Sequence, residues 1–459
     1  MDSWLKAALD YIPHWIDYQV RMFEQPGCVI ALAHKGEVVL EQAFGVANLA
    51  SGEKLTPRHR FRVASHSKSF TATGILKLKD AGSLRLDDTA GSYVDGLHAD
   101  AASATILQLL SHSAGLVRDG GDSSYFADQR PFLTASELKA ALAVPQPLPA
   151  AERFKYSNHG FALLGLIIEQ VTGEPYTKWI AREIVQAAGL TETAPDIGGL
   201  NGAPLAAGHS TLLPLGRRLM IPGDNVTNDM AAATGFLATA ADLTRFFSQL
   251  APKSASTLLS PASRREMTRR HWRDVDTTLE RYYGLGLGCG SIKGWAFFGH
   301  GGSFPGTLSR TAVFPAEDVA VSVLGNSIEA PSHIWVDGIA HILSVFRAGG
   351  APSEAAADWT GRWWGLWGPL DLVAVGDKVL ASPAALNPPL TEVSEISVSS
   401  RDAGKIVRAP GFNSPGEPAR RVRNDSGEVV EVWLGGVHLV GEAAFEKEIT
   451  ARYGRAAKT

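Results

Sequence analysis

Apolar residues along the chain form two pairs of β-rich runs that lie far apart in sequence. Residues 28–33 and 37–44 flank His34-Lys35-Gly36, and residues 308–314 and 319–324 flank a second short turn, so each pair predicts a hairpin. Between the hairpins, apolar positions recur mostly at helical spacing, over residues 65–81, 105–110, 136–143 and 159–171. This layout predicts an α+β fold, with one sheet built from distant halves and a helical region inserted between them.

The pattern changes after residue 346. Residues 347–358 read RAGGAPSEAAAD, a stretch typical of a linker. Residues 359–459 then carry short strands separated by turn residues, which favours a compact antiparallel barrel or sandwich. We interpret the tryptophans at 359, 363, 364 and 367 as a plug for its core. The predicted boundaries are therefore 1–346 for a first domain, 347–358 for the linker and 359–459 for a second domain.

The N-terminal residues show apolar positions at helical spacing, interrupted by Asp2, Lys6 and Asp10. They predict an amphipathic helix with a bend near Pro13, and they do not resemble a secretory signal. We therefore expect a cytoplasmic protein. The longest apolar run near a predicted helix, residues 161–168, is far shorter than the roughly 20 residues that span a bilayer, so no membrane partner is expected.

Composition narrows the classes of partner. The 459 residues include 43 Lys and Arg against 47 Asp and Glu, a net charge of −4, which argues against nucleic-acid binding. Two cysteines exclude a disulfide framework, and the 13 histidines show no metal-ligand spacing. We expect no metal and no cofactor, with a small molecule as partner; whether the chain forms a homo-oligomer is left open.

The first candidate for chemistry is Ser65-His66-Ser67-Lys68. Ser-x-x-Lys places a hydroxyl and an amine one helical turn apart on one face. A partly desolvated lysine has a lowered pKa and can remove the proton of the serine, which is otherwise a poor nucleophile. Three other Ser-x-x-Lys matches lie on predicted solvated faces or a polar turn, whereas Ser65 opens a helix with a buried face. There its own N–H is free to donate to an oxyanion.

Two further motifs are each ambiguous alone. Tyr156-Ser157-Asn158 precedes a predicted helix, and a phenol beside a lysine ammonium ionises more easily and relays protons. Alternatively, the tyrosine packs beside a capping asparagine. The segment His300-Gly301-Gly302-Ser303 has glycines that let a backbone approach a ligand, and a strand N–H there could be the second oxyanion donor. Alternatively, it is a glycine-rich turn with an incidental histidine.

Together, in this order and spacing, the three motifs resemble the serine β-lactamase and penicillin-binding-protein superfamily, in particular the class C and peptidase S12 branch. Residues 105–116, 235–243 and 283–286 also look similar to the framework of that branch. The resemblance covers roughly residues 25–345. It implies an antiparallel sheet flanked by helices with a helical subdomain over 1–346. D-aminopeptidases of this family append β-barrels, and 359–459 is expected to be such a domain, of lipocalin-like type.

The resemblance also implies roles for the site residues. Ser65 is expected to be acylated, Lys68 to activate it and Tyr156 to relay protons, whereas Asn158 orients Lys68 and the substrate amide. The N–H groups of Ser65 and Ser303 form the oxyanion hole.

His300, together with Gly301 and Gly302, is expected to contact substrate. Many members have lysine where this chain has His300, and histidine there looks more like the D-aminopeptidase, D-amino-acid amidase and esterase members. The leading hypothesis is a serine hydrolase of small amides or peptides, with D-residues among the candidates. The alternatives are a carboxylesterase, a β-lactamase or DD-peptidase, and a non-catalytic ligand binder.

Overall fold

The computed structural model describes residues 1–213, 215–411 and 413–454. Residue 412 and residues 455–459 of the predicted second domain lie outside this described part. The chain divides into two compact units. One is Glu24–Val336, and the other combines Met1–Phe23 with Asp337–Thr459.

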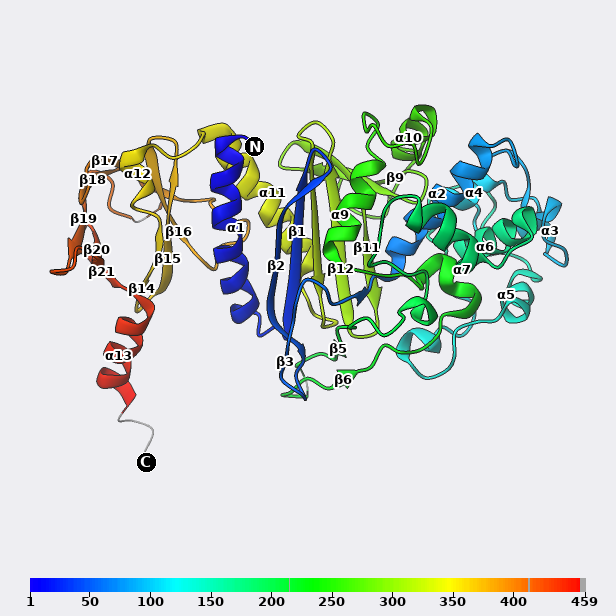
Figure 1. Ribbon diagram of the computed structural model, residues 1–459, viewed down its shortest axis with the longest axis horizontal. Helices are drawn as coiled ribbons and strands as arrows, with labels where there is room; N and C mark the ends of the chain where they lie inside the picture. Colours follow the sequence, from blue (N-terminus) through cyan, green and yellow to red (C-terminus); the bar gives the residue numbers. More distant parts are fainter. Residues whose placement is uncertain (214, 412, 455–459) are drawn as a thin grey trace. The chain divides into compact units, whose positions relative to one another are not determined.

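A nine-stranded sheet forms the centre of the first unit (Figure 1). In order across the sheet, its strands are β3 (Glu53–Lys54), β2 (Glu37–Asn48), β1 (Gly27–His34), β13 (Val319–Gly325), β12 (Thr307–Phe314), β11 (Trp295–Phe304), β10 (Gly288–Ile292), β9 (Tyr282–Tyr283) and β8 (Trp272–Arg273). Neighbouring strands are antiparallel. Cys28 of β1 lies opposite Gly325 of β13, which confirms the prediction of one sheet built from distant halves.

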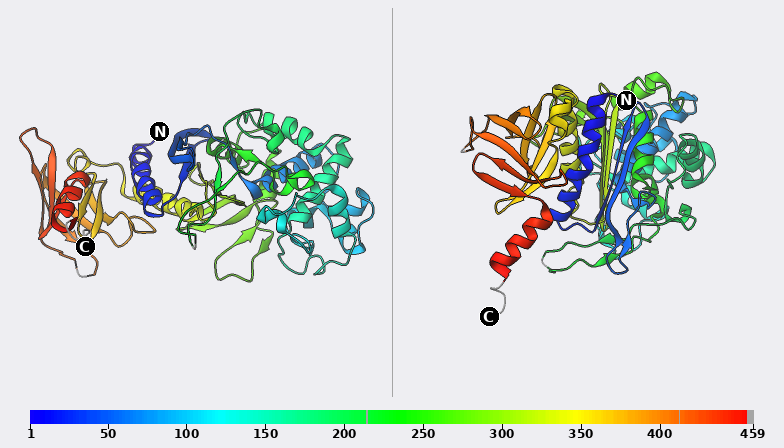
Figure 2. Two further views of the ribbon diagram at one scale, coloured as in Figure 1. Left: turned by 90° about the horizontal axis from the view of Figure 1, so that it is seen from below. Right: turned by 60° about the vertical axis from the view of Figure 1, so that its left-hand side comes forward.

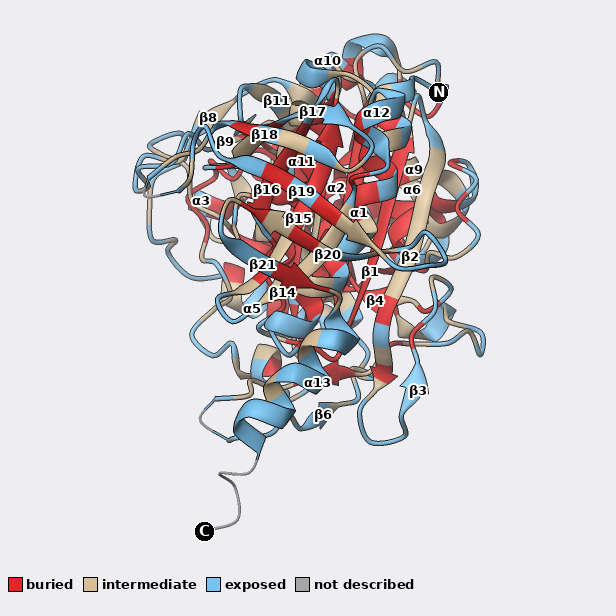
Figure 3. Cartoon of the chain, turned by 90° about the vertical axis from the view of Figure 1, so that its left-hand side faces the viewer, coloured by how far each residue is buried: buried red, intermediate tan, exposed pale blue. Residues whose placement is uncertain are grey.

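The central strands are buried on both faces, which explains why their sequences read as continuous apolar runs. Every residue of β13 is buried, and β1 is buried except at its last residue. Helix α9 (Ala240–Gln249) packs against both of these strands. Strand β2, nearer the edge, is half-buried over most of its length (Figure 3).

Most of the helices lie between β4 and β8 in the sequence, as predicted. The four predicted segments appear as α2 (Ser67–Asp80), α4 (Ile106–Leu110), α5 (Ala135–Leu142) and α6 (Asn158–Thr172). The region also contains α9, described above, and the helices α3 (Ala99–Ala102), α7 (Tyr176–Ile180), α8 (Ala231–Thr234) and α10 (Pro261–Thr268). Two short strand pairs complete it: β4 (Phe61–Arg62) with β7 (Leu237–Ala238), and β5 (Gly208–His209) with β6 (Met220–Ile221). Helices α2, α6 and α8 pack on one another around a shared apolar core.

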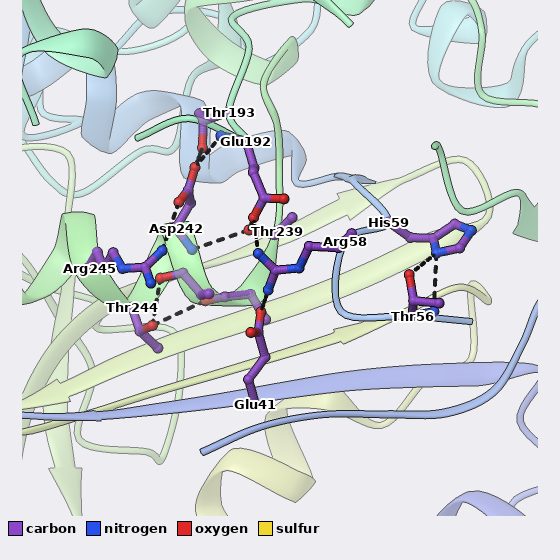
Figure 4. A network of polar contacts seen from close by, with 12 residues as sticks. Glu41, Thr56, Arg58, His59, Glu192, Thr193, Thr239, Asp242, Thr244 and Arg245 are labelled. Atoms are coloured by element: carbon purple, nitrogen blue, oxygen red, sulfur yellow. Dashed lines mark hydrogen bonds and ion pairs between the residues drawn. The ribbon is translucent and has the colours of Figure 1, made fainter. Parts of the chain in front are cut away.

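A polar network connects the sheet to α9 (Figure 4). Arg58 contacts Glu41 of β2 and donates to Glu192 at 2.5 Å. The buried carboxylate of Asp242 on α9 accepts from the Glu192 backbone N–H at 2.8 Å and from the Thr193 hydroxyl at 3.0 Å. These hydrogen bonds satisfy a charge with no solvent exposure, and they fix Glu192 and Thr193 against α9.

The second unit contains a closed antiparallel barrel of eight strands, as predicted (Figure 2). In order, the strands are β14 (Gly361–Gly365), β15 (Gly368–Val375), β16 (Lys378–Pro383), β17 (Ser394–Ser400), β18 (Ala403–Arg408), β19 (Pro418–Arg423), β20 (Val429–Leu434) and β21 (Val437–Val440). Helix α13 (Glu442–Tyr453) follows and has no buried residue (Figure 3).

The predicted tryptophan plug is only partly correct. Trp359 is buried in the barrel core, and Trp363 and Trp364 are half-buried on β14. Trp367 is 99% exposed because it lies in the tight turn between β14 and β15, where its side chain has no core to face.

The N-terminal helix α1 (Ser3–Met22) groups with the barrel rather than with the sheet. Its Tyr11 hydroxyl donates to Asp371 of β15 at 2.9 Å, and the Gln19 amide donates to the carbonyl of Ala384 at 3.1 Å. Helix α11 (Ser332–Gly349) crosses the division at residue 336, and Trp15 packs on its Gly338. The units therefore do not follow a single cut at residue 346. The predicted linker holds the end of α11 and helix α12 (Glu354–Ala357).

None of the helices in the described ranges is long and apolar enough to cross a membrane.

Candidate active site

Ser65 lies in a single 3-10 turn, Ala64–His66, directly before α2. The approach to this turn is fixed, because the Val63 N–H donates to the carbonyl of Phe236 at 3.0 Å. Ala64 has a φ of +45°, a left-handed conformation that is strained for a residue with a Cβ. Strain held by surrounding hydrogen bonds is common beside reactive groups, and here it immediately precedes the predicted nucleophile.

Lys68 lies one turn after Ser65, with its side chain fully buried. Its amine donates to the Ser65 hydroxyl at 3.1 Å and to the backbone carbonyl of Ala233 at 2.8 Å. Burial lowers the pKa of the Lys68 amine well below its ordinary value of 10.5; the nearby Asp119 opposes this effect and Arg118 reinforces it. A lysine in this state can accept the proton of the serine.

Tyr156 approaches Ser65 from the other side. Its hydroxyl donates to the Ser65 oxygen at 2.9 Å, and the Lys68 amine lies 4.9 Å from the centre of its ring. Burial raises the pKa of the Tyr156 phenol above its ordinary value of 10.0, against the effects of the Ser65 hydrogen bond and of Arg118. The sequence predicted the opposite shift, a pKa lowered by the positive charge of the lysine. Burial has the larger effect on the phenol, and it also disfavours the charged form of Lys68. Tyr156 is therefore a proton donor at neutral pH.

Asn158, the first residue of α6, lines the same cavity as Ser65. Its amide donates to Asp119 at 2.5 Å, whereas its buried Oδ1 has no hydrogen-bond partner within the described part of the chain. The second hydrogen bond of Lys68 is to Ala233, not to Asn158. The predicted orienting contact between Asn158 and Lys68 is thus replaced here by a backbone carbonyl.

Gly301, Gly302 and Ser303 lie on β11 along the cavity wall. Strand β11 pairs with β10 only as far as Gly299. Beyond Gly299, the same edge of β11 faces the 3-10 turn that contains Ser65. A Cβ on Gly302 would lie 2.0 Å from the carbonyl oxygen of Val63, so glycine is needed for this approach.

His300 is brought close to the site but not into the cavity. It is 8% exposed; its Nδ1 lies 2.7 Å from the carbonyl of Gly301 and its Nε2 lies 2.9 Å from the hydroxyl of Tyr283. Burial, reinforced by His66 and Lys68, lowers the pKa of His300 well below its ordinary value of 6.5. The ring is neutral at pH 7, and its two contacts connect Gly301 of β11 with Tyr283 of β9. A buried, neutral His300 therefore does not supply a positive charge for a substrate carboxylate. The lysine that many members of the family have at this position would supply one.

The cavity measures about 530 Å³, and several of its features were missed by sequence reasoning. Arg118 and Asp119 line it, as does Arg310 of β12, which lies opposite Gly301. The Ala233 carbonyl carries no side-chain signal at all. Arg118 and Asp119 lie just after the segment 105–116 that resembles the family framework, which is the signal that could have pointed to them.

Comparison with known proteins gives the family of the chain. The family model for β-lactamase matches residues 16–333. The chain belongs to the β-lactamase family. This β-lactamase-family chain has the predicted fold, together with the closed C-terminal barrel.

Its relatives resemble it at low identity. Protein flp of Staphylococcus aureus strain COL is 28% identical over 183 residues, which are 39% of this chain and 36% of that protein. The match therefore spans about a third of the length of the staphylococcal relatives. The octameric penicillin-binding protein homologue from Pyrococcus abyssi has 23% identity and a TM-score of 0.66, covering 94% of this chain and 99% of its own. D-amino acid amidase from Ochrobactrum anthropi SV3, complexed with D-phenylalanine, has 23% identity and a TM-score of 0.62, covering 73% and 99%.

Proposed function

We propose that this chain hydrolyses small amides or peptides through an acyl-enzyme on Ser65, in the manner of a D-amino-acid amidase or D-aminopeptidase. The observation that carries the proposal is the double contact on the Ser65 oxygen. The buried amine of Lys68 lies 3.1 Å from it and the half-buried phenol of Tyr156 lies 2.9 Å from it. Burial lowers the pKa of the amine and raises that of the phenol, which favours the neutral amine as the base and the protonated phenol as the acid.

The reaction follows from these positions. As the Ser65 oxygen attacks the amide carbonyl, its proton passes to the Lys68 amine. The carbonyl oxygen becomes an oxyanion, which accepts hydrogen bonds from the backbone N–H groups of Ser65 and Ser303. Tyr156 then donates its proton to the leaving amine and regains one from Lys68, which leaves an ester on Ser65. Water attacks this ester and gives a proton to the same pair. The pair returns that proton to the Ser65 oxygen as its bond to the acyl carbon breaks, which releases the carboxylic acid and restores the serine hydroxyl.

Two observations support an amide substrate within this family. One structural neighbour is named as a D-amino acid amidase, and it resembles this chain over 73% of its length. In addition, His300 is buried and neutral, so it does not supply the cation with which many β-lactamases and DD-peptidases hold a carboxylate. A carboxylesterase uses the same catalytic groups and is the second candidate.

The octameric neighbour supports a homo-oligomer, which light scattering tests.

A fluorophosphonate probe tests the acylation step. We expect one stable mass adduct on Ser65, absent from Ser65→Ala and retained by Ser123→Ala, which removes another serine of the same cavity. An adduct on a different serine, or none in a folded protein, would contradict the proposal. Amino-acid anilides of both configurations, compared with short-chain aryl esters, then separate the candidates. Turnover confined to esters would indicate the carboxylesterase, and rapid hydrolysis of a chromogenic cephalosporin would indicate a β-lactamase.

A further inference from the structure

Among the described residues that line the Ser65 cavity, Asp119 is the one that carries a carboxylate. It lies between α4 and α6, and its side chain is only 13% exposed. The backbone around it is held firmly. The N–H groups of Asn158 and His159 donate to the carbonyl of Arg118 at 2.9 and 3.2 Å, and the Tyr125 hydroxyl donates to the carbonyl of Asp119 at 2.9 Å.

The two oxygens of this carboxylate have different partners. Oδ1 accepts from the Asn158 amide at 2.5 Å, a neutral group that is buried at the start of α6. Oδ2 is paired with the Arg118 Nε at 3.1 Å, and the Arg118 side chain is 67% exposed. The charge of a largely buried carboxylate is therefore balanced by a cation that can move into solvent. Exposed ion pairs of this kind contribute little stability, so another cation can replace the arginine at low cost.

We propose that Asp119 binds the free α-ammonium group of the substrate, with Arg118 giving up its place to that group. The assignment rests on the proposed function, because it concerns the acyl part of the molecule that Ser65 attacks. In an α-amino acyl substrate, the ammonium nitrogen is two bonds from the carbonyl carbon. Its receptor must therefore line the same cavity as the nucleophile, as Asp119 does. The substrate class is then an amide or ester of an amino acid or peptide with an unblocked N-terminus.

The competing interpretation is that Asp119 only positions Asn158. The two interpretations predict different results for ligands with and without a charge. A positioning residue affects ligands with a free and with a blocked amine equally, whereas an ammonium receptor affects only the first. Asp119→Asn is the suitable variant, because its side-chain oxygen can still accept from Asn158 while the negative charge is lost.

Binding to the Ser65→Ala protein tests the proposal without requiring any turnover. Calorimetry compares phenylalanine amide, in each configuration, with its N-acetyl derivative. We expect at least one configuration of the free amine to bind roughly 10- to 100-fold more tightly than its blocked form, as for a charge-assisted hydrogen bond. Adding Asp119→Asn should abolish the difference, and adding Arg118→Ala should increase it. Asp122→Asn is the matched control, since it removes an exposed carboxylate nearby that pairs with Arg130 and does not line the cavity.

A second measurement needs no change at Asp119. The affinity of phenylalanine amide for Ser65→Ala should fall as the pH rises through the pKa of the ligand amine, about 7.7–8.0 for an α-amino group. The affinity of the N-acetyl amide should stay constant over that range.

Equal affinity for free and blocked ligands, or binding of neither, would overturn the proposal. So would a preference that survives Asp119→Asn, or an Asp119→Asn effect of equal size on both ligands. The fluorophosphonate adduct on Ser65 is measured on protein with the native serine. A failure of the ammonium site is therefore distinguishable from a failure of the hydrolase proposal.

Discussion

Replacing Gly302 by alanine should damage catalysis far more than replacing its neighbour Gly301. A Cβ at position 302 would lie 2.0 Å from the Val63 carbonyl oxygen and 2.7 Å from the Ser309 hydroxyl. Atoms of this kind do not approach within 3.0 Å, so β11 must move away from Val63 by at least about 1 Å. Val63 cannot give way instead, because its N–H bonds to Phe236 and its carbonyl accepts from the His66 N–H.

The size of the effect follows from that displacement. Ser303 is next to Gly302 on β11, so a shift of about 1 Å moves its N–H away from the oxyanion. Loss of one oxyanion donor costs about 10²–10³ in kcat, and a misplacement of 1 Å about 10². We expect Gly302→Ala to lower kcat about 100-fold with a smaller change in KM. Overpacking should also lower stability by about 1–3 kcal/mol.

The assay is steady-state hydrolysis of an activated aryl ester, with a thermal melt to show that each variant is folded. Gly301→Ala is the matched control, because its Cβ would meet its nearest neighbour at 3.4 Å, an ordinary contact. A folded Gly302→Ala variant with kcat within about threefold of the native chain would refute the reasoning. An equal loss in Gly301→Ala would refute it too, since the effect would then not depend on the Val63 contact.

Three further predictions concern single groups. The kcat/KM for an aryl ester should rise with pH, and the midpoint of this rise should lie well below 10.5, because burial lowers the pKa of Lys68 and only its neutral amine accepts a proton. The same rise with the same midpoint in Lys68→Arg would contradict this assignment. Tyr156→Phe should slow anilide hydrolysis about 10²–10⁴-fold but affect nitrophenyl esters less, since nitrophenolate leaves unprotonated, and equal losses would exclude the relay. Asp242→Ala leaves the Glu192 N–H and the Thr193 hydroxyl without their acceptor, so the free energy of unfolding measured in urea should fall by about 1–3 kcal/mol. A fall below about 0.5 kcal/mol would mean that water replaces the carboxylate.

The motif residues show how far side-chain patterns reach. Ser65 and Lys68 are predictable as neighbours because helical spacing alone places them on one face, and Tyr156 because the order of motifs resembles a known family. The architecture was predictable for the same reasons, and the family match confirms it. The roles of the individual site residues stay predictions until they are tested in solution.

Other features had no signal in the sequence. The Ala233 carbonyl that holds Lys68 is a backbone group, and any residue supplies one. The burial of His300 depends on Tyr283 meeting it across the sheet, which pairing decides rather than spacing. The direction of the Tyr156 pKa shift also depends on burial, a property of the folded site. Long-range packing therefore accounts for most of what sequence patterns could not predict.

The pairing of α1 with the barrel also affects the order in which the chain can fold during synthesis. Tyr11 and its partner Asp371 are 360 residues apart. At translation rates of about 5–20 residues per second, the helix leaves the ribosome roughly 20–70 s before β15 exists. During that time the barrel is not yet available to pack against the apolar face of α1, which includes Ile12, Trp15 and Ile16. The unit Glu24–Val336 can complete its sheet first, whereas α1 gains its contacts with the barrel only after β15 has been synthesised.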